Sequence, residues 1–252
     1  MPAPVANELQ ARAAGVRILL IRRRMESPDG PIFFTAHSGG DGREPWLATA
    51  PLPDPEALLD VDLESLAAGD PGPGTPVNHP IYLVCTHGRH DICCADMGRP
   101  LYRAMSEVRP EWTWEVSHIG GDRFAGNLLV LPRGDYFGRL DPEDAGLMVI
   151  DYETGRLNIA HHRGRSVQPR LVQAAEHFLR QSEQLTGIND LSVVDYRRSS
   201  HDHAELVFRG PEAITYRVEV SAREVPEAEY LTCRAEQPGF GVVYDLVSLT
   251  KE

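Results

Sequence analysis

The residues best suited to chemistry gather in one short motif, VCTHGRHDICC. It holds three of the four cysteines of the chain together with two histidines: Cys85, Cys93, Cys94, His87 and His90. Soft thiolates and imidazoles on turn-rich backbone are the ligands that iron–sulfur clusters and zinc ions require. A packed core does not need this combination, so the motif predicts a metal centre.

A second motif, SHIGGDRFAGN, adds another pair of candidate ligands, His118 and Asp122, with Gly120 and Gly121 between them. Glycine accepts positive φ and lets backbone N–H groups approach a ligand closely. Amides aimed at sulfides and thiolates stabilise the extra charge of a reduced cluster. The two motifs therefore predict two loops, each presenting a pair of potential ligands to one centre.

Two predicted strands would bring these loops together. The segment IYLVC, residues 81–85, is typical of a buried strand, and it places Cys85 at its C-terminal end. The segment TWEVSH, residues 113–118, places His118 at the same kind of position. Ligands gather at the carboxyl ends of strands in open α/β sheets, so this arrangement favours a shared site.

The elements that follow complete a recognisable order. We expect a helix over residues 98–108 with Asp96 as its cap, because apolar residues there recur at helical spacing. A hairpin and two further helices are expected over residues 127–140, 141–155 and 167–187. The order strand–helix–strand–hairpin–helix is that of a thioredoxin-like layer in an α/β (α+β) fold.

The two ends of the chain add further elements. Strands are predicted over residues 15–24 and 31–37, and a helix near residues 55–66. After residue 187 the pattern alternates at period two, which predicts an antiparallel unit of five strands: LSVVDYRR, HAELVFRG, AITYRVEVS, EYLTCRA and FGVVYDLVSL. We therefore expect two domains, residues 1–187, including the N-terminal strand extension, and a β-rich subdomain over residues 188–252.

The segments CTHGRHDICCADMGRPL, SHIGGDRFAGNLLVLP and YFGRL resemble the sucrase/ferredoxin-like family, a branch of the thioredoxin-like ferredoxins. The resemblance covers roughly residues 15–185. It implies a [2Fe-2S] cluster held by two cysteines of the first loop and an H-x-x-x-H pair of the second. Carried over to this chain, the ligands would be Cys85, Cys94 and His118.

The fourth ligand departs from that pattern, because Asp122 stands where the family has histidine. Asp122 would ligate iron through its carboxylate, or Cys93 or a nearby histidine would take its place, or the cluster would be lost. The preserved trio of Cys85, Cys94 and His118 favours a working site. Next to the ligands, Gly120, Gly121, Arg123 and Asn127 are expected to contact the cofactor or to orient its loops.

Two alternatives use the same residues. A thiol oxidoreductase would use Cys93 or Cys94 as nucleophile, but the chain lacks a C-x-x-C motif and adjacent cysteines form a strained disulfide. A structural zinc site would use Cys85, His87, His90 and Cys94, which leaves the second motif unexplained. Cys233 is alone in a predicted strand and is expected to be a core residue.

Composition limits the function further. The 252 residues include 25 basic and 37 acidic side chains, and the net charge of −12 disfavours nucleic acid as a partner. No apolar run has the length of a membrane span, and the N-terminus lacks the pattern of a secretory signal. We expect a cytoplasmic electron carrier or redox sensor with no substrate of its own, whose partner is a reductase or an acceptor protein. No pair of carboxylates marks a glycosidase site.

Overall fold

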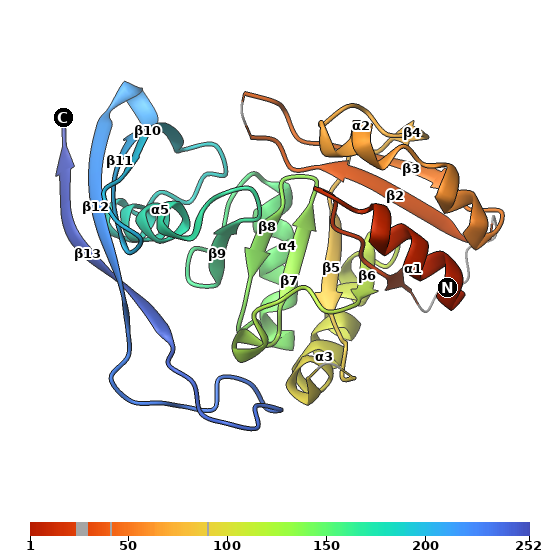
Figure 1. The fold of residues 1–252 in the computed structure, drawn as a ribbon. Helices are drawn as coiled ribbons and strands as arrows, with labels where there is room; N and C mark the ends of the chain where they lie inside the picture. Colours follow the sequence, from red (N-terminus) through yellow and green to blue (C-terminus); the bar gives the residue numbers. More distant parts are fainter. Residues whose placement is uncertain (24–29, 41, 90) are drawn as a thin grey trace.

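The computed structural model describes residues 1–23, 30–40, 42–89 and 91–252. Figure 1 shows a central sheet with a smaller sheet on one side and a C-terminal sheet on the other. Within the described residues the central sheet has six strands, in the order β1 (Ile21–Arg22), β6 (Thr113–Val116), β5 (Ile81–Cys85), β7 (Leu128–Leu131), β8 (Asp135–Phe137) and β9 (His162–Arg165).

The central strands have the predicted connection. Strand β5 is parallel to β6 and antiparallel to β7, and β7 in turn pairs with β8, also in the antiparallel direction. Helices α3 (Ile92–Val108), α4 (Ala145–Glu153) and α5 (Arg170–Glu183) complete this part of the chain. The predicted thioredoxin-like layer in an α/β (α+β) fold is confirmed. Among the described residues, no helix has both the length and the apolar character needed to cross a membrane.

Strand β5 lies between β6 and β7, and both of its faces are covered. All five of its residues are buried. Tyr82 and Val84 pack into a core that also contains side chains of α3 and α4. Ile81, Leu83 and Cys85 face a second core on the opposite side of the sheet. Because side chains of a strand alternate between faces, Cys85 points away from the core that α3 and α4 share.

Helix α3 differs from its prediction in a way that matters for the site. The prediction began at residue 98 with Asp96 as cap, but the helix begins at Ile92, and Asp91 Oδ1 accepts a hydrogen bond from the Cys93 N–H at 3.2 Å. Asp residues favour the position before a helix because their carboxylate satisfies such an N–H group. Both Cys93 and Cys94 therefore lie on the first turn of α3.

The N-terminal part adds a small sheet and short helices. The predicted strand over 31–37 is confirmed as β2 (Ile32–His37). Of the strand predicted over 15–24, the described residues 15–23 form β1 alone, and residue 24 lies outside them. The helix expected near residues 55–66 is a 3-10 turn followed by a short helix. The remaining elements are α1 (Ala3–Arg12), β3 (Trp46–Pro51), η1 (Pro55–Asp60), α2 (Leu63–Ala67) and β4 (Thr75–Pro76).

The additional C-terminal antiparallel sheet is confirmed, but one predicted strand is wrong. Its strands are β10 (Ser192–Arg198), β11 (His203–Arg209), β12 (Thr215–Glu224) and β13 (Val242–Lys251). The segment EYLTCRA belongs to none of them, because β12 pairs directly with β13 from Glu224 opposite Val242. Helix α5 packs on this sheet through Leu171 and Leu179. The domain boundary after residue 187 stays a prediction.

Candidate metal centre

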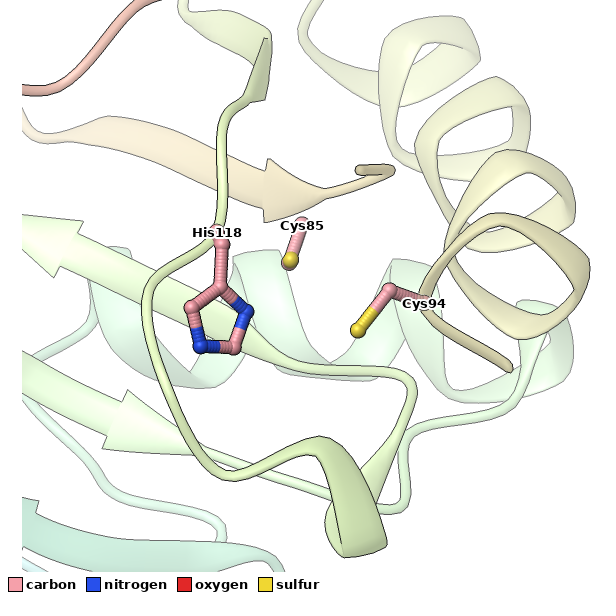
Figure 2. Close-up of side chains that lie close together, drawn as sticks. All are labelled: Cys85, Cys94 and His118. Carbon is pink, nitrogen blue, oxygen red and sulfur yellow. The ribbon is translucent and has the colours of Figure 1, made fainter. Parts of the chain in front are cut away.

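Three side chains from separate elements converge beside the end of β5. Cys85 is the last residue of β5, Cys94 lies on the first turn of α3, and His118 follows β6. Their two sulfurs and one ring nitrogen all lie within 4.8 Å of one another. Figure 2 shows the three side chains around one common space. Both cysteines are 1% exposed, while His118 is half-buried.

The start of α3 favours negative charge at Cys94. Asp91 caps the helix, so Cys94 is its third residue and lies at the positive end of the helix dipole. A helix N-terminus lowers the free energy of a thiolate relative to a thiol. The thiolate is the form that binds metals. The first motif is therefore placed where its second cysteine is suited to ligation.

The backbone around His118 is held by side chains from three other segments of the chain. His87 Nδ1 accepts a hydrogen bond from the His118 N–H at 3.1 Å, which ties the two loops together. Arg17 Nη2 donates to the His118 carbonyl at 3.3 Å, and the Tyr136 hydroxyl donates to the Ile119 carbonyl at 3.3 Å. Burial raises the pKa of Tyr136 even though Arg17 opposes the shift, so the phenol keeps the proton that it donates.

The glycine pair and Asn127 fix the rest of the loop. Gly120 and Gly121 have φ values of +87° and +77°, which favour glycine over other residues. Asn127 is 1% exposed, and its Nδ2 donates to the Gly121 carbonyl at 2.7 Å. The Cys85 N–H in turn donates to the Asn127 carbonyl at 3.0 Å. Asn127 thus links the backbone of both ligand loops.

Arginine side chains surround Phe124 next to this loop. The guanidinium carbons of Arg163, Arg123 and Arg139 lie 3.8, 4.7 and 5.2 Å from the ring centre. Arg163 Nη1 also donates to Asn127 Oδ1 at 3.2 Å. Burial, helped by the charge of Arg123, lowers the pKa of Arg163 to about 10, so the guanidinium keeps its positive charge at neutral pH.

The sequence did not single out Arg163 or Tyr136. Arg163 belongs to the HHRGRS segment, which forms the edge strand β9 and pairs with β8. The number of residues between Arg163 and the cysteines does not predict that they lie close together, because the contact arises from strand pairing across the sheet. The expected positions of Gly120, Gly121, Arg123 and Asn127 all lie on the loop next to the three donors.

Cys93 points to a different group of side chains. Its sulfur donates to Asp91 Oδ1 at 3.1 Å, and Asp91, Cys93 and Cys233 place one donor atom each within 4.8 Å of one another. Burial and the hydrogen bond to Asp91 raise the pKa of Cys93 to about 12. Cys233 is exposed, so its expected place in the core is wrong.

The side chains of two candidate ligands, Asp122 and His90, lie outside the described part of the structure. The backbone of Asp122 begins the 3-10 turn η2 (Asp122–Phe124), directly after the glycine pair. Its side chain, like the whole of His90, lies outside the described residues. Asp122 therefore remains a predicted fourth ligand on the strength of its place in the loop.

The fold and the group of Cys85, Cys94 and His118 define a thioredoxin-like layer that carries a thiol and imidazole site. The chain belongs to the sucrase/ferredoxin-like family, whose model matches residues 20–165, more than half of its length.

Comparisons with individual proteins cover shorter segments. The chain is 33% identical over 95 residues to "Altered inheritance of mitochondria protein 32" of Meyerozyma guilliermondii, covering 33% of this chain and 34% of that protein. It is 35% identical over 94 residues to the protein of the same name from Eremothecium gossypii, covering 34% and 26%. The chain thus matches about a third or less of these relatives' length.

Among solved structures, the thioredoxin-like [2Fe-2S] ferredoxin from Aquifex aeolicus is similar to part of the chain. The identity is 18% and the TM-score 0.32, with 37% of this chain and 97% of that chain covered.

Proposed function

We propose that this protein binds a [2Fe-2S] cluster and uses it to carry electrons or to sense redox state. The observation that carries the proposal is the convergence of two buried cysteine sulfurs and one imidazole nitrogen within 4.8 Å. Thiolates and imidazoles are the ligands of [2Fe-2S] clusters. Membership of a family described as ferredoxin-like agrees with this assignment.

Cys85, Cys94 and His118 would hold the cluster, and Asp122 would supply the fourth ligand. The loop that carries the last two is fixed by His87, which accepts the His118 N–H, and by the hydrogen bonds described above. A ligand loop held in place before the metal arrives loses little conformational freedom on binding. When bound, the cluster would accept and release one electron.

The charges of the protein suit a buried anionic cluster and a basic partner. Arg163 contacts the ligand loop, and the N-terminus of α3 faces Cys94, so both favour negative charge at the centre. The net charge of −12 would attract a basic redox protein, either a reductase or an acceptor. We expect this exchange to take place in the cytoplasm, where thiols stay reduced.

The alternatives lack comparable support. In a zinc site made by the first loop alone, His118 would have no role, although it is one of the three converging donors. A thiol oxidoreductase on this fold would use a C-x-x-C pair, and the sequence has none. The donor set of Cys85, Cys94 and His118 fits a cluster better than either alternative.

The test is anaerobic purification followed by iron and sulfide analysis, visible absorption and EPR after dithionite. Wild type should be red-brown with about two irons per chain. Cys85→Ser and Cys94→Ser should lose the cluster, and His118→Ala should lose it or change its EPR signal. Asp122→Ala should shift the EPR signal if its carboxylate ligates iron.

Two variants serve as controls. Asp96→Ala removes an exposed carboxylate from α3 and should leave the spectra unchanged. Cys93→Ser tests the competing fourth ligand, and unchanged spectra in this variant would leave that position to Asp122 or a histidine. A colourless wild-type protein that takes up zinc but no iron after reconstitution would overturn the proposal.

A further inference from the structure

The segment between β12 and β13 leaves the C-terminal sheet and reaches the ligand loops. We call this segment, residues 225–241, the arm. Figure 1 shows the arm extending from the C-terminal sheet toward α3. At its far end Arg234 donates to the carbonyls of Gly88 and Arg89 at 3.3 and 2.5 Å. The arm therefore contacts the first ligand loop directly.

The second ligand loop contacts the chain where the arm joins β13. Arg123, which follows Asp122, donates through Nη2 to the carbonyl of Val242, the first residue of β13, at 3.4 Å. A Cβ added at Gly241 would lie 3.0 Å from Arg123 Nη1, which shows how closely the two segments approach. The arm is thus in contact with both loops that carry the candidate ligands.

The tip of the arm brings a cysteine to Cys93. The sulfurs of Cys93 and Cys233 and a carboxylate oxygen of Asp91 lie within 4.8 Å of one another. Asp91 is 1% exposed and accepts a hydrogen bond from the Cys93 thiol, whereas Cys233 is exposed to solvent. One sulfur is thus fixed on the first turn of α3 and the other is accessible on a segment outside the sheet ladder.

We propose that Cys93 and Cys233 form a reversible disulfide that closes the arm over the metal centre. The oxidant is a small-molecule disulfide such as oxidised glutathione. The Cys233 sulfur attacks it and releases one glutathione thiol, which leaves a mixed disulfide on Cys233. The Cys93 sulfur then attacks the Cys233 sulfur and releases the second glutathione thiol. Two protein thiols are oxidised, one external disulfide is reduced, and both thiol protons pass to the released glutathione.

The two sulfurs of this group can react with each other without a further donor. A disulfide needs the two sulfurs alone, which have to approach to about 2.05 Å. The arm belongs to no strand or helix within the described residues 225–241, so it can make that movement. Arg234 keeps the arm next to the first ligand loop meanwhile.

The consequence is a link between thiol oxidation and access to the centre. Cys93 is adjacent to Cys94, so a bond to Cys233 would join the arm to the residue next to a candidate ligand. The bond would suppress local opening of the arm, which otherwise exposes the ligand loops. Under reducing conditions hydrogen bonds, among them those of Arg234 and Arg123, would hold the arm, and a partner could displace it.

The test uses the full chain, purified anaerobically and equilibrated in buffers of rising oxidised-to-reduced glutathione ratio. After alkylation of the remaining thiols, peptide mapping without reduction should show residues 224–234 joined to residues 90–103. The second peptide also contains Cys94, so Cys93→Ser has to abolish the product, as does Cys233→Ser. Thr232→Ala changes the neighbouring residue of the arm and should retain the product.

Mapping needs no bound cluster, so it stands whether or not the proposed function does. All four cysteines alkylated at every glutathione ratio would overturn the disulfide. So would one equivalent of zinc that depends on both Cys93 and Cys233. The closing role rests on the proposed function: loss of iron to a chelator should be about tenfold slower in the oxidised wild type. Equal rates in the oxidised and reduced forms would overturn that role.

Discussion

Gly98 and Cys85 are in direct backbone contact: a Cβ added at Gly98 would lie 1.9 Å from the carbonyl oxygen of Cys85. Helix α3 therefore packs against the end of β5 with no room for a side chain. This contact sets the distance between the Cys85 at the strand end and the Cys94 one turn earlier on the helix. The geometry of the two thiols thus depends on one glycine.

We predict that Gly98→Ala separates the two cysteines and destabilises the fold. The methyl group would push α3 from the sheet, and overpacking of this kind costs about 1–3 kcal/mol. Urea unfolding measures the loss, and iron content measures the effect on the site. Gly146→Ala is the matched control, because a Cβ there meets nothing within 4 Å on helix α4. Equal stability of the two variants would contradict the prediction.

The start of α3 shows where prediction from sequence reached its limit. Asp91 and Asp96 are both acceptable caps, and the apolar spacing of the helix begins only after Gly98. What decides between them is the Asp91 hydrogen bond to the Cys93 N–H, which depends on where β5 ends. The strands that deliver Cys85 and His118 were predictable, because short segments rich in β-branched and aromatic residues are typical of strands.

The arm shows a second limit. The segment EYLTCRA alternates like a strand, yet it lies between Pro226 and Pro238 and is excluded from the ladder that joins β12 to β13. Strand propensity depends on having a partner to pair with. The contact between Cys93 and Cys233 joins residues far apart in the chain, so no local pattern could predict it.

Arg163 should raise the reduction potential of the proposed cluster. Its charged guanidinium contacts Asn127 and the ligand loop, and a nearby positive charge stabilises the reduced state. We expect Arg163→Gln to lower the potential by on the order of 50 mV. Redox titration followed by EPR measures the shift. Arg197→Gln, on the exposed face of β10, is the control. A potential that is unchanged in Arg163→Gln would refute this role.

Asp135 should make the fold sensitive to acid. It is fully buried, yet its pKa is lowered from 3.8 to about 2, because contacts with His162, Arg133 and Tyr152 outweigh the effect of burial. A lowered folded-state pKa stabilises the protein above pH 3.8, and this contribution is lost as the pH falls toward 2. The contribution at neutral pH is about 2 kcal/mol.

Urea unfolding of wild type and Asp135→Asn between pH 7 and pH 3 tests this expectation. The wild type should lose more stability than the variant on acidification, because the variant has no carboxylate to protonate at this position. Asp96→Asn is the control, since its side chain is exposed on α3. Parallel pH profiles for wild type and Asp135→Asn would rule out the role of Asp135.

Arg180 should be essential for holding α5 to the loop that follows it. It is 1% exposed, pairs with Glu176 at 2.8 Å, and donates to the carbonyls of Leu185 and Gly187 at 3.0 and 2.8 Å. Arg180→Met would leave Glu176 as a buried, uncompensated charge, which costs about 3–5 kcal/mol. Thermal and urea unfolding measure the loss.

The double variant Arg180→Met, Glu176→Leu separates the two sources of that cost. Removing both charges relieves the buried carboxylate, so part of the stability should return. The loss of stability that remains in the double variant is caused by the carbonyls of the loop after α5, because they lose their hydrogen-bond donor. If the double variant is no more stable than Arg180→Met, the cost comes from those carbonyls alone and not from the unpaired Glu176.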